Sequence, residues 1–242
     1  MIDLISQEIF TESEFQAHPL GAKGQDKFGN TYRYVQNGGV ALTTGNLLQE
    51  AAEDTNFRSM VVNTTGAIGS DEVEVTLGGT AVTANMFDEG SLVIESSTGI
   101  GQVFRIKRHD VQTSTTGSCT FVLDRPLKIA TVAASSQASV RKNSYDGVIA
   151  FPVTPTGAPV GIALYAMTIG YFGWIQSGGD AVALFDNQTN SAADESALMP
   201  SRDVAGSVTA VTEALAAPVH IGWSREQVSV DSTMGFVHLI ID

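Results

Sequence analysis

Histidine, cysteine and paired carboxylates are the residue types in this sequence that could take part in catalysis or bind a metal. The four histidines are widely separated, and none has a second His, a Cys or an Asp at the short spacing typical of metal ligands. They are His18, His109, His220 and His238. The sequence also lacks a Gly-x-Ser-x-Gly elbow, a phosphate-binding Gly-x-x-x-x-Gly-Lys loop and a His-Glu-x-x-His motif. We therefore expect no catalytic residue, no metal site and no bound cofactor.

Adjacent acidic residues occur as pairs at several places. They are Glu53-Asp54, Asp71-Glu72, Asp88-Glu89 and Asp194-Glu195. Two carboxylates that act as acid and base must face each other across a cleft, and adjacency in sequence does not provide this arrangement. We interpret the pairs as solvated turns. Asp186-Asn187, together with the last pair, offers oxygen ligands for a hard cation, but without the spacing of a calcium-binding loop.

One cysteine and one basic cluster are the remaining reactive side chains. Cys119 has no partner for an internal disulfide, and its neighbours in residues 118–123 predict a small side chain in a buried strand. Arg105 and Lys107 alternate along a predicted strand, so their side chains share one face. These two side chains either lie against acidic neighbours of the same chain or contact an acidic partner.

Composition and charge restrict the class of partner. The 13 Lys and Arg residues against 26 Asp and Glu residues give a net charge of −13, which argues against nucleic-acid binding. Such a charge favours solubility or contact with a basic surface. The first residues include acids and no long apolar region, so we expect no secretion signal and synthesis in a cytoplasm. Glycines divide the most apolar segment, residues 160–185, into pieces too short to span a bilayer, so we expect no membrane contact.

The arrangement of apolar residues predicts an all-β fold. Residues 31–36 alternate in polarity, which places Tyr32 and Tyr34 on one face of a strand. Short strands separated by glycine-rich turns recur through residues 67–146 and predict a small sandwich or barrel. Residues 44–54 are the best helical candidate, because four apolar residues in them lie at helical spacing: Leu47, Leu48, Ala51 and Ala52.

The segment 160–185 is the predicted centre of the fold. Residues 171–175 have the aromatic and β-branched character of a strand that is buried on both faces. Ser177-Gly178-Gly179-Asp180 predicts a turn, and residues 181–185 predict the returning strand of a buried hairpin. At the end of the chain, residues 235–241 predict a well-buried final strand.

These predictions divide the chain into three parts. Residues 1–21 are an N-terminal arm, residues 22–66 and 147–242 form a discontinuous main β domain, and residues 67–146 form an inserted β domain. The arm is either a short helix or an extended strap that docks its aromatic residues on a neighbour. The predicted partner contacts lie in the arm, in the inserted domain and in the polar loop 187–199. They are Ile9, Phe10, Phe15, Arg105, Lys107, Asp194 and Glu195.

Several stretches, taken in their order along the chain, carry a resemblance to a known family. The first is residues 26–35, Asp-Lys-Phe-Gly-Asn-Thr-Tyr-Arg-Tyr-Val. The others are residues 71–83, 99–107, 123–127, 143–148, 159–176 and 221–240. They resemble tailed-bacteriophage head proteins that serve as capsid decoration (cement) or structural proteins. The resemblance covers roughly residues 20–242, and it rests on turn and strand motifs rather than on reactive residues.

The resemblance implies a protein without catalytic residues that binds the outside of an assembled head and stabilises it against internal genome pressure. It implies the major capsid protein as partner, a symmetric homo-oligomer, and a location on the capsid exterior after synthesis in a bacterial host. A trimer is preferred, since a β unit at a local threefold axis is a common arrangement among cement proteins. Binding in many copies lets modest contacts add up, and oligomer formation covers edge strands.

Two other functions compete with this expectation. The alternative is a tail or head-fibre component that binds host-surface glycan, which exposed aromatics such as Trp223 beside a shallow groove would favour. An enzyme on a β scaffold, such as a lyase or hydrolase, requires converging carboxylates or histidines, and the sequence does not display them.

Overall fold

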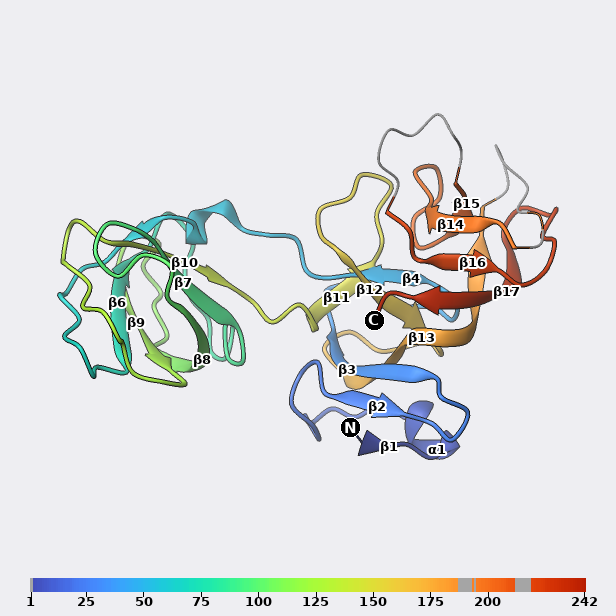
Figure 1. Ribbon diagram of the computed structural model, residues 1–242, viewed down its shortest axis with the longest axis horizontal. Coiled ribbons are helices and arrows are strands. Elements are labelled where there is room, and N and C mark those ends of the chain that lie inside the picture. The colour runs from blue at the N-terminus through green and yellow to red at the C-terminus, as the bar shows by residue number, and fades with distance from the viewer. Residues whose placement is uncertain (1, 187–192, 194, 212–218) are drawn as a thin grey trace. The chain divides into compact units, whose positions relative to one another are not determined.

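The computed structural model describes residues 2–186, 193, 195–211 and 219–242. The chain divides into two compact units, one formed by Met1–Ala52 and Ser144–Asp242 and the other by Glu53–Asn143. The regular secondary structure of both is almost entirely β-strand, which confirms the predicted all-β fold (Figure 1). Within the described ranges, no helix reaches the length and hydropathy required to cross a bilayer.

The first unit contains two closed barrels that share one strand. The first barrel has the strand order β3 (Thr31–Asn37), β11 (Asp146–Ala150), β4 (Leu47–Gln49), β12 (Pro159–Ala163) and β13 (Phe172–Phe185). It closes because the first half of β13 also pairs with β3, from Phe172 opposite Gln36 to Gly178 opposite Thr31. Its interior is filled by apolar side chains that include Val35, Leu48, Val148 and Ile175.

The second barrel uses the other half of β13. Its further strands are β15 (Val208–Ala210), β14 (Ala197–Pro200), β16 (Gly222–Ser224) and β17 (Thr233–Ile240). β17 pairs antiparallel with β13 from Gly178–Ile240 to Phe185–Thr233 and closes the barrel. The core includes Phe185, Leu198, Ile221 and Val237, all with 0% exposure.

The predicted hairpin at residues 171–185 is wrong, because β13 runs through Gly178-Gly179 without reversing. Gly178 pairs with Thr31 on one side and with Ile240 on the other, so this is where the strand passes from one barrel to the next. Gly179 has φ +86° and lies against Asn30, whose side-chain oxygen accepts a hydrogen bond of 3.0 Å from the backbone N–H of Asp180. Glycine permits this left-handed conformation, and the strand continues through it.

The predicted helix at residues 44–54 is also wrong. Two of its four apolar residues, Leu47 and Leu48, lie in β4, in which neighbouring side chains point in opposite directions, and Ala51 and Ala52 follow the strand. Leu47 packs in the core of the second barrel and Leu48 in the core of the first, and both are fully buried. A strand that lies between two cores buries side chains on both faces and therefore carries consecutive apolar residues. In a short stretch of sequence, such a pattern can be mistaken for the spacing of apolar residues in a helix.

The N-terminal segment, defined here as residues 2–20, packs on the first unit instead of extending from it. β1 (Ile2–Asp3) pairs in parallel with β2 (Lys23–Gln25), which pairs antiparallel with β3. The four-residue helix α1 (Ser6–Ile9) follows β1. The segment is therefore an additional layer over β3 and β13, held by strand pairing and by the aromatic cluster described below.

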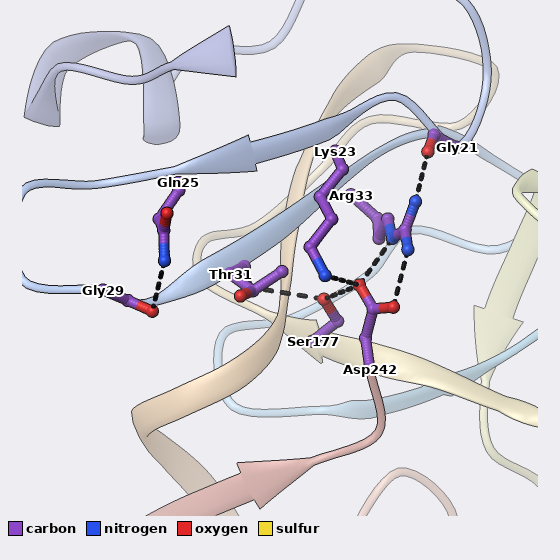
Figure 2. A network of polar contacts seen from close by, with 8 residues as sticks. All are labelled: Gly21, Lys23, Gln25, Gly29, Thr31, Arg33, Ser177 and Asp242. Atoms are coloured by element: carbon purple, nitrogen blue, oxygen red, sulfur yellow. Dashed lines mark hydrogen bonds and ion pairs between the residues drawn. The ribbon is translucent and has the colours of Figure 1, made fainter. Parts of the chain in front are cut away.

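Asp242 joins the end of the second barrel to the strands of the first (Figure 2). Its carboxylate accepts hydrogen bonds from Arg33 Nε at 2.7 Å and from a terminal guanidinium nitrogen of Arg33 at 2.6 Å. Lys23 Nζ lies 3.4 Å from the same carboxylate, and the Ser177 hydroxyl lies 3.3 Å from it. The Arg33 guanidinium also donates to the carbonyl oxygen of Gly21 at 2.8 Å.

The second unit is a six-stranded sheet. Its strand order is β5 (Met60–Val61), β10 (Gln137–Arg141), β7 (Ser91–Ser96), β8 (Val103–His109), β9 (Ser118–Leu123) and β6 (Glu72–Thr76). A bridge between Val62 and Val75 brings its two edge strands together. Phe57, Phe87 and Phe121 meet edge to face at the centre of its core.

The second unit begins earlier than the predicted inserted domain, at Glu53 instead of residue 67. The 3₁₀ helix η1 (Thr55–Phe57) and β5 supply Phe57, Met60 and Val62 to its core. At the other boundary the unit ends at Asn143, because β11 already belongs to the first barrel. Side-chain burial thus assigns residues 53–66 to the smaller unit.

Candidate functional site

The N-terminal segment covers an aromatic cluster on the outer face of β3 and β13. His18 lies edge-on to Tyr34, with ring centroids 5.2 Å apart, and tilted against Trp174 at 5.4 Å. Tyr34 and Trp174 meet edge to face at 5.2 Å. Burial raises the pKa of the Tyr34 hydroxyl, which accepts a 3.0 Å hydrogen bond from the Ala17 N–H. Such ring pairs stabilise the contact beyond simple area burial.

Hydrogen bonds fix the middle of the N-terminal segment as well. Ser13 and Phe172 exchange backbone hydrogen bonds of 2.9 and 2.8 Å. The Glu12 carboxylate accepts from the N–H and the hydroxyl of Thr168 at 2.7 and 2.8 Å. The hydroxyl of Tyr165 donates to the carbonyl of Thr11 at 3.0 Å, and burial and then the nearby Glu12 carboxylate raise its pKa.

The three predicted contact residues of the segment have different environments. Ile9 is 4% exposed and packs in the cluster with Leu4 and Leu20, so its side chain serves the chain's own fold. Phe10 is 58% exposed and Phe15 is 77% exposed. These two phenylalanines remain available as surface contacts on a segment whose backbone is held in place.

A second candidate site is an open groove on the outer face of the second barrel. Its volume is about 590 Å³, within the range of roughly 300–1,000 Å³ common for small-molecule sites. It is lined by Glu195, Ala197, Trp223, Arg225 and Phe236. β14, β16 and β17 supply most of this lining, because alternate residues of each strand point outward.

The indole of Trp223 is held in place by its cross-strand neighbours. Trp223 pairs with His238 of β17, and the two rings stack with centroids 4.9 Å apart and an interplanar angle of 18°. His238 Nδ1 lies 2.7 Å from the Asp180 carboxylate, directly across the next strand pair. On the opposite side, Trp223 pairs with Ala197 of β14. The small methyl group of Ala197 leaves the groove open beside the indole.

Arg225 and Phe236 form the other side of the groove. The guanidinium carbon of Arg225 lies 6.0 Å from the centre of the Phe236 ring, within the range of a cation–π contact. The Arg225 N–H donates to the Phe236 carbonyl at 2.9 Å, and the Phe236 N–H donates to a carboxylate oxygen of Glu226 at 2.7 Å. The backbone of Glu195 is fixed by a 3.0 Å hydrogen bond to the carbonyl of Ser224.

Of the remaining predicted contact residues, the two on β8 belong to neither site and Glu195 belongs to the groove. Arg105 and Lys107 are exposed on β8 of the second unit, and Arg105 pairs with the Glu89 carboxylate at 3.2 Å. Glu195 lines the groove. Asp194 lies outside the described residues.

Within the described residues, the cysteine, histidine and aspartate side chains considered as reactive groups do not gather in one place. Each makes contacts that serve the fold. Cys119 is buried in the core of the second unit, where burial and then the Asp110 carboxylate raise its pKa to about 11. The His109 ring accepts a 3.0 Å hydrogen bond from the Phe87 N–H. Asp186 is buried and accepts a hydrogen bond from the Ser201 hydroxyl, while Asn187 lies outside the described residues. In the part of the chain that the structure describes, no three His, Cys, Asp or Glu side chains gather closely enough to hold a metal ion.

The sequence analysis named Trp223 as an aromatic whose exposure beside a groove would favour glycan binding, and it missed Arg225 and Phe236. The final strand was expected to be well buried, yet β17 is buried on one face only, and Phe236 and Ile240 are 39% and 48% exposed. The alternation of Gly235 and Val237 with bulkier residues was the available signal for two different faces. The pairing of β16 with β17 determines which of their outward-facing residues meet. Local sequence does not specify this pairing.

Comparisons with known proteins give no relative for this chain. No family model matches the sequence, and no match is found among the curated proteins or the solved structures.

Proposed function

We propose that this protein is a non-enzymatic virion structural protein that binds the outer surface of a bacteriophage head as a decoration (cement) protein. The ordered series of turn and strand motifs that resembles such head proteins supports the proposal. The observation that carries it in the structure is the pair of exposed phenylalanines, Phe10 and Phe15, on the N-terminal segment. Exposed aromatic side chains on a fixed backbone suit protein contact, because little conformational entropy is lost when they bind.

The architecture suits a role in which the protein bears load. Each barrel of the first unit is closed through β13, and closure leaves few strand edges open to unwanted pairing. The major capsid protein is the proposed partner, and the protein would act as a homo-oligomer, preferably a trimer. Attachment at many equivalent positions lets a modest contact per copy stabilise a whole head.

The direct experiment is a binding titration of purified protein on undecorated heads, measured by co-sedimentation. We expect saturable binding of the wild type and at least a tenfold weaker affinity for the double variant Phe10→Ala, Phe15→Ala, because it removes both exposed rings of the proposed contact. Within the fold, the Phe10 ring lies against Tyr165, with ring centroids 6.4 Å apart. Phe28→Ala is the matched control, because Phe28 is 79% exposed but lies outside the N-terminal segment.

The possible results separate the function from the contact residues. Absence of saturable wild-type binding contradicts the decoration function. Saturable binding that the double variant retains in full contradicts the assignment of Phe10 and Phe15. The mass of the free protein in solution tests the proposed trimer independently.

A tail or head-fibre component that binds host-surface glycan is the second candidate function. The groove beside Trp223 is the specific observation that favours it.

A further inference from the structure

We propose that the groove lined by Trp223, Phe236, Ala197, Glu195 and Arg225 is a binding site for a neutral carbohydrate. The inference does not depend on attachment to a phage head, because the groove lies on β14, β16 and β17, whereas the proposed head contact lies on the N-terminal segment. The groove combines an aromatic wall with charged groups of both signs, and these features define the ligand chemistry.

The aromatic wall is preorganised before any ligand arrives. One face of the Trp223 indole stacks on His238, whose Nδ1 lies 2.7 Å from the Asp180 carboxylate. This arrangement fixes the ring without covering it, since Trp223 remains 37% exposed. On its other side the strand pairing places Ala197, the smallest of the lining side chains. A flat ligand ring can therefore lie beside the indole above this methyl group at little entropic cost.

Among the described residues, the charged groups that line the groove are a carboxylate and a guanidinium. Glu195 accepts hydrogen bonds and Arg225 only donates them. A sugar ring presents an apolar C–H face to an aromatic wall, while its hydroxyl groups at the rim both donate and accept. It can thus satisfy Glu195 and Arg225 together while one face packs on Trp223 or Phe236. Few other small molecules combine an apolar face, hydrogen-bond donors and hydrogen-bond acceptors in one ring.

The charges also disfavour other classes of ligand. An anionic ligand would meet Glu195 and a chain of net charge −13. A cation would be attracted by Glu195 and by the net charge, but the guanidinium of Arg225, which lies beside Phe236, would repel it within the groove. A wholly apolar ligand would remove both charged groups from water without replacing their hydrogen bonds. A neutral polyhydroxylated ring avoids all three penalties.

The test is a glycan array of neutral hexose, deoxyhexose and N-acetylhexosamine oligosaccharides probed with the full chain. The neutral oligosaccharide retained most strongly is then titrated in solution, with sialyllactose and choline chloride in parallel. Tryptophan fluorescence provides the signal, because the other tryptophan, Trp174, is only 3% exposed. We expect saturable binding of the neutral sugar. Choline should cause no change in tryptophan fluorescence, and the sialic acid of sialyllactose should not strengthen binding.

Calorimetric titration of variants tests whether the sugar binds in the groove. The measured quantity is the affinity of each variant for the same sugar. Trp223→Ala is expected to weaken the affinity at least tenfold, and Trp223→Phe to restore part of it by returning an aromatic face. Ile240→Ala is the matched control, because Ile240 is an exposed apolar residue of the same strand as Phe236 but does not line the groove. Its affinity should stay within twofold of the wild type.

Three results would overturn the proposal. One is an array on which no neutral oligosaccharide is retained. The second is equal sugar affinity of Trp223→Ala and the wild type, with matching thermal unfolding curves that show both to be folded. The third is binding of choline instead of sugar, which would identify the aromatic walls as a site for a quaternary ammonium group.

Discussion

Asp242 shows how one side chain can join distant parts of a fold. Its carboxylate meets Arg33 of β3 in a two-pronged contact, and Lys23 and Ser177 lie close by. The hydrogen bonds from Arg33 lower its pKa below the usual value, with a smaller contribution from Lys23, although partial burial opposes them. The side chain is 20% exposed, so water and salt screen the pair in part.

A lowered pKa in the folded state determines the sign of the pH dependence. The unfolded chain binds the proton more tightly, so the stabilisation is fully present above the unfolded value of about 4 and is lost as the pH falls through the folded value. We predict that Asp242→Asn reduces the free energy of unfolding at pH 7 by roughly 0.5–1 kcal/mol. The difference from the wild type should shrink below about pH 4 in urea titrations.

The control for this prediction is Asp3→Asn, which changes an exposed carboxylate in the same unit. The free energy of unfolding of this variant should match that of the wild type both at pH 7 and below about pH 4. An Asp242→Asn deficit that persists unchanged in acid would show that the carboxylate charge is not the source of the stabilisation.

At the scale of elements, β13 decides the architecture of the first unit. Its first half completes one barrel and its second half the other, and Gly178-Gly179 lie at the change of partner. A Cβ atom on Gly179 would lie 2.3 Å from Asn30 Oδ1, and the backbone there has φ +86°. The Asn30 side chain cannot simply rotate away, because it also accepts from the Asp180 N–H and donates to the Asp26 carboxylate.

We therefore predict that Gly179→Ala destabilises the protein by about 2–3 kcal/mol, the sum of a left-handed alanine and a lost hydrogen bond. Chemical denaturation measures this difference directly. Gly39→Ala is the matched control, since nothing lies within 4 Å of its added Cβ, and its effect should stay within about 0.5 kcal/mol. Equal stability of the two variants would contradict the role assigned to the strand crossing.

At the scale of the whole molecule, the chain forms two compact units, and the first of them is discontinuous in sequence. The second unit, Glu53–Asn143, interrupts the first between β4 and β11. Its core has its own aromatic centre and a complete set of paired strands. A unit of this kind should retain its fold when the flanking chain is removed.

We predict that residues 53–143, produced alone, fold cooperatively. The measurements are a dispersed NMR spectrum and a single sigmoidal urea transition. Phe121→Ala in the same fragment should lose about 3–5 kcal/mol, because Phe121 is fully buried in that core. An isolated fragment without cooperative unfolding would show that its strands depend on the first unit.

The sequence alone was sufficient for the all-β class and for most strands. Alternating polarity in residues 31–36 and glycine-rich turns are local properties, and they determine local extended structure whatever the rest of the chain does. Trp223 was named only as an aromatic whose exposure would favour glycan binding. The groove around it was not predictable in full, because Arg225 and Phe236 meet only through the pairing of β16 with β17.

Only the tertiary structure decided what the ambiguous segments became. Gly178-Gly179 has the local signature of a turn, yet β3 and β17 offer hydrogen-bonding partners on both sides, and the strand continues. Leu47 and Leu48 have helical spacing with their neighbours, yet two cores on opposite sides of one strand bury both. Pairings between residues far apart in sequence supply most of the stabilisation at these positions, and a local pattern carries no information about them.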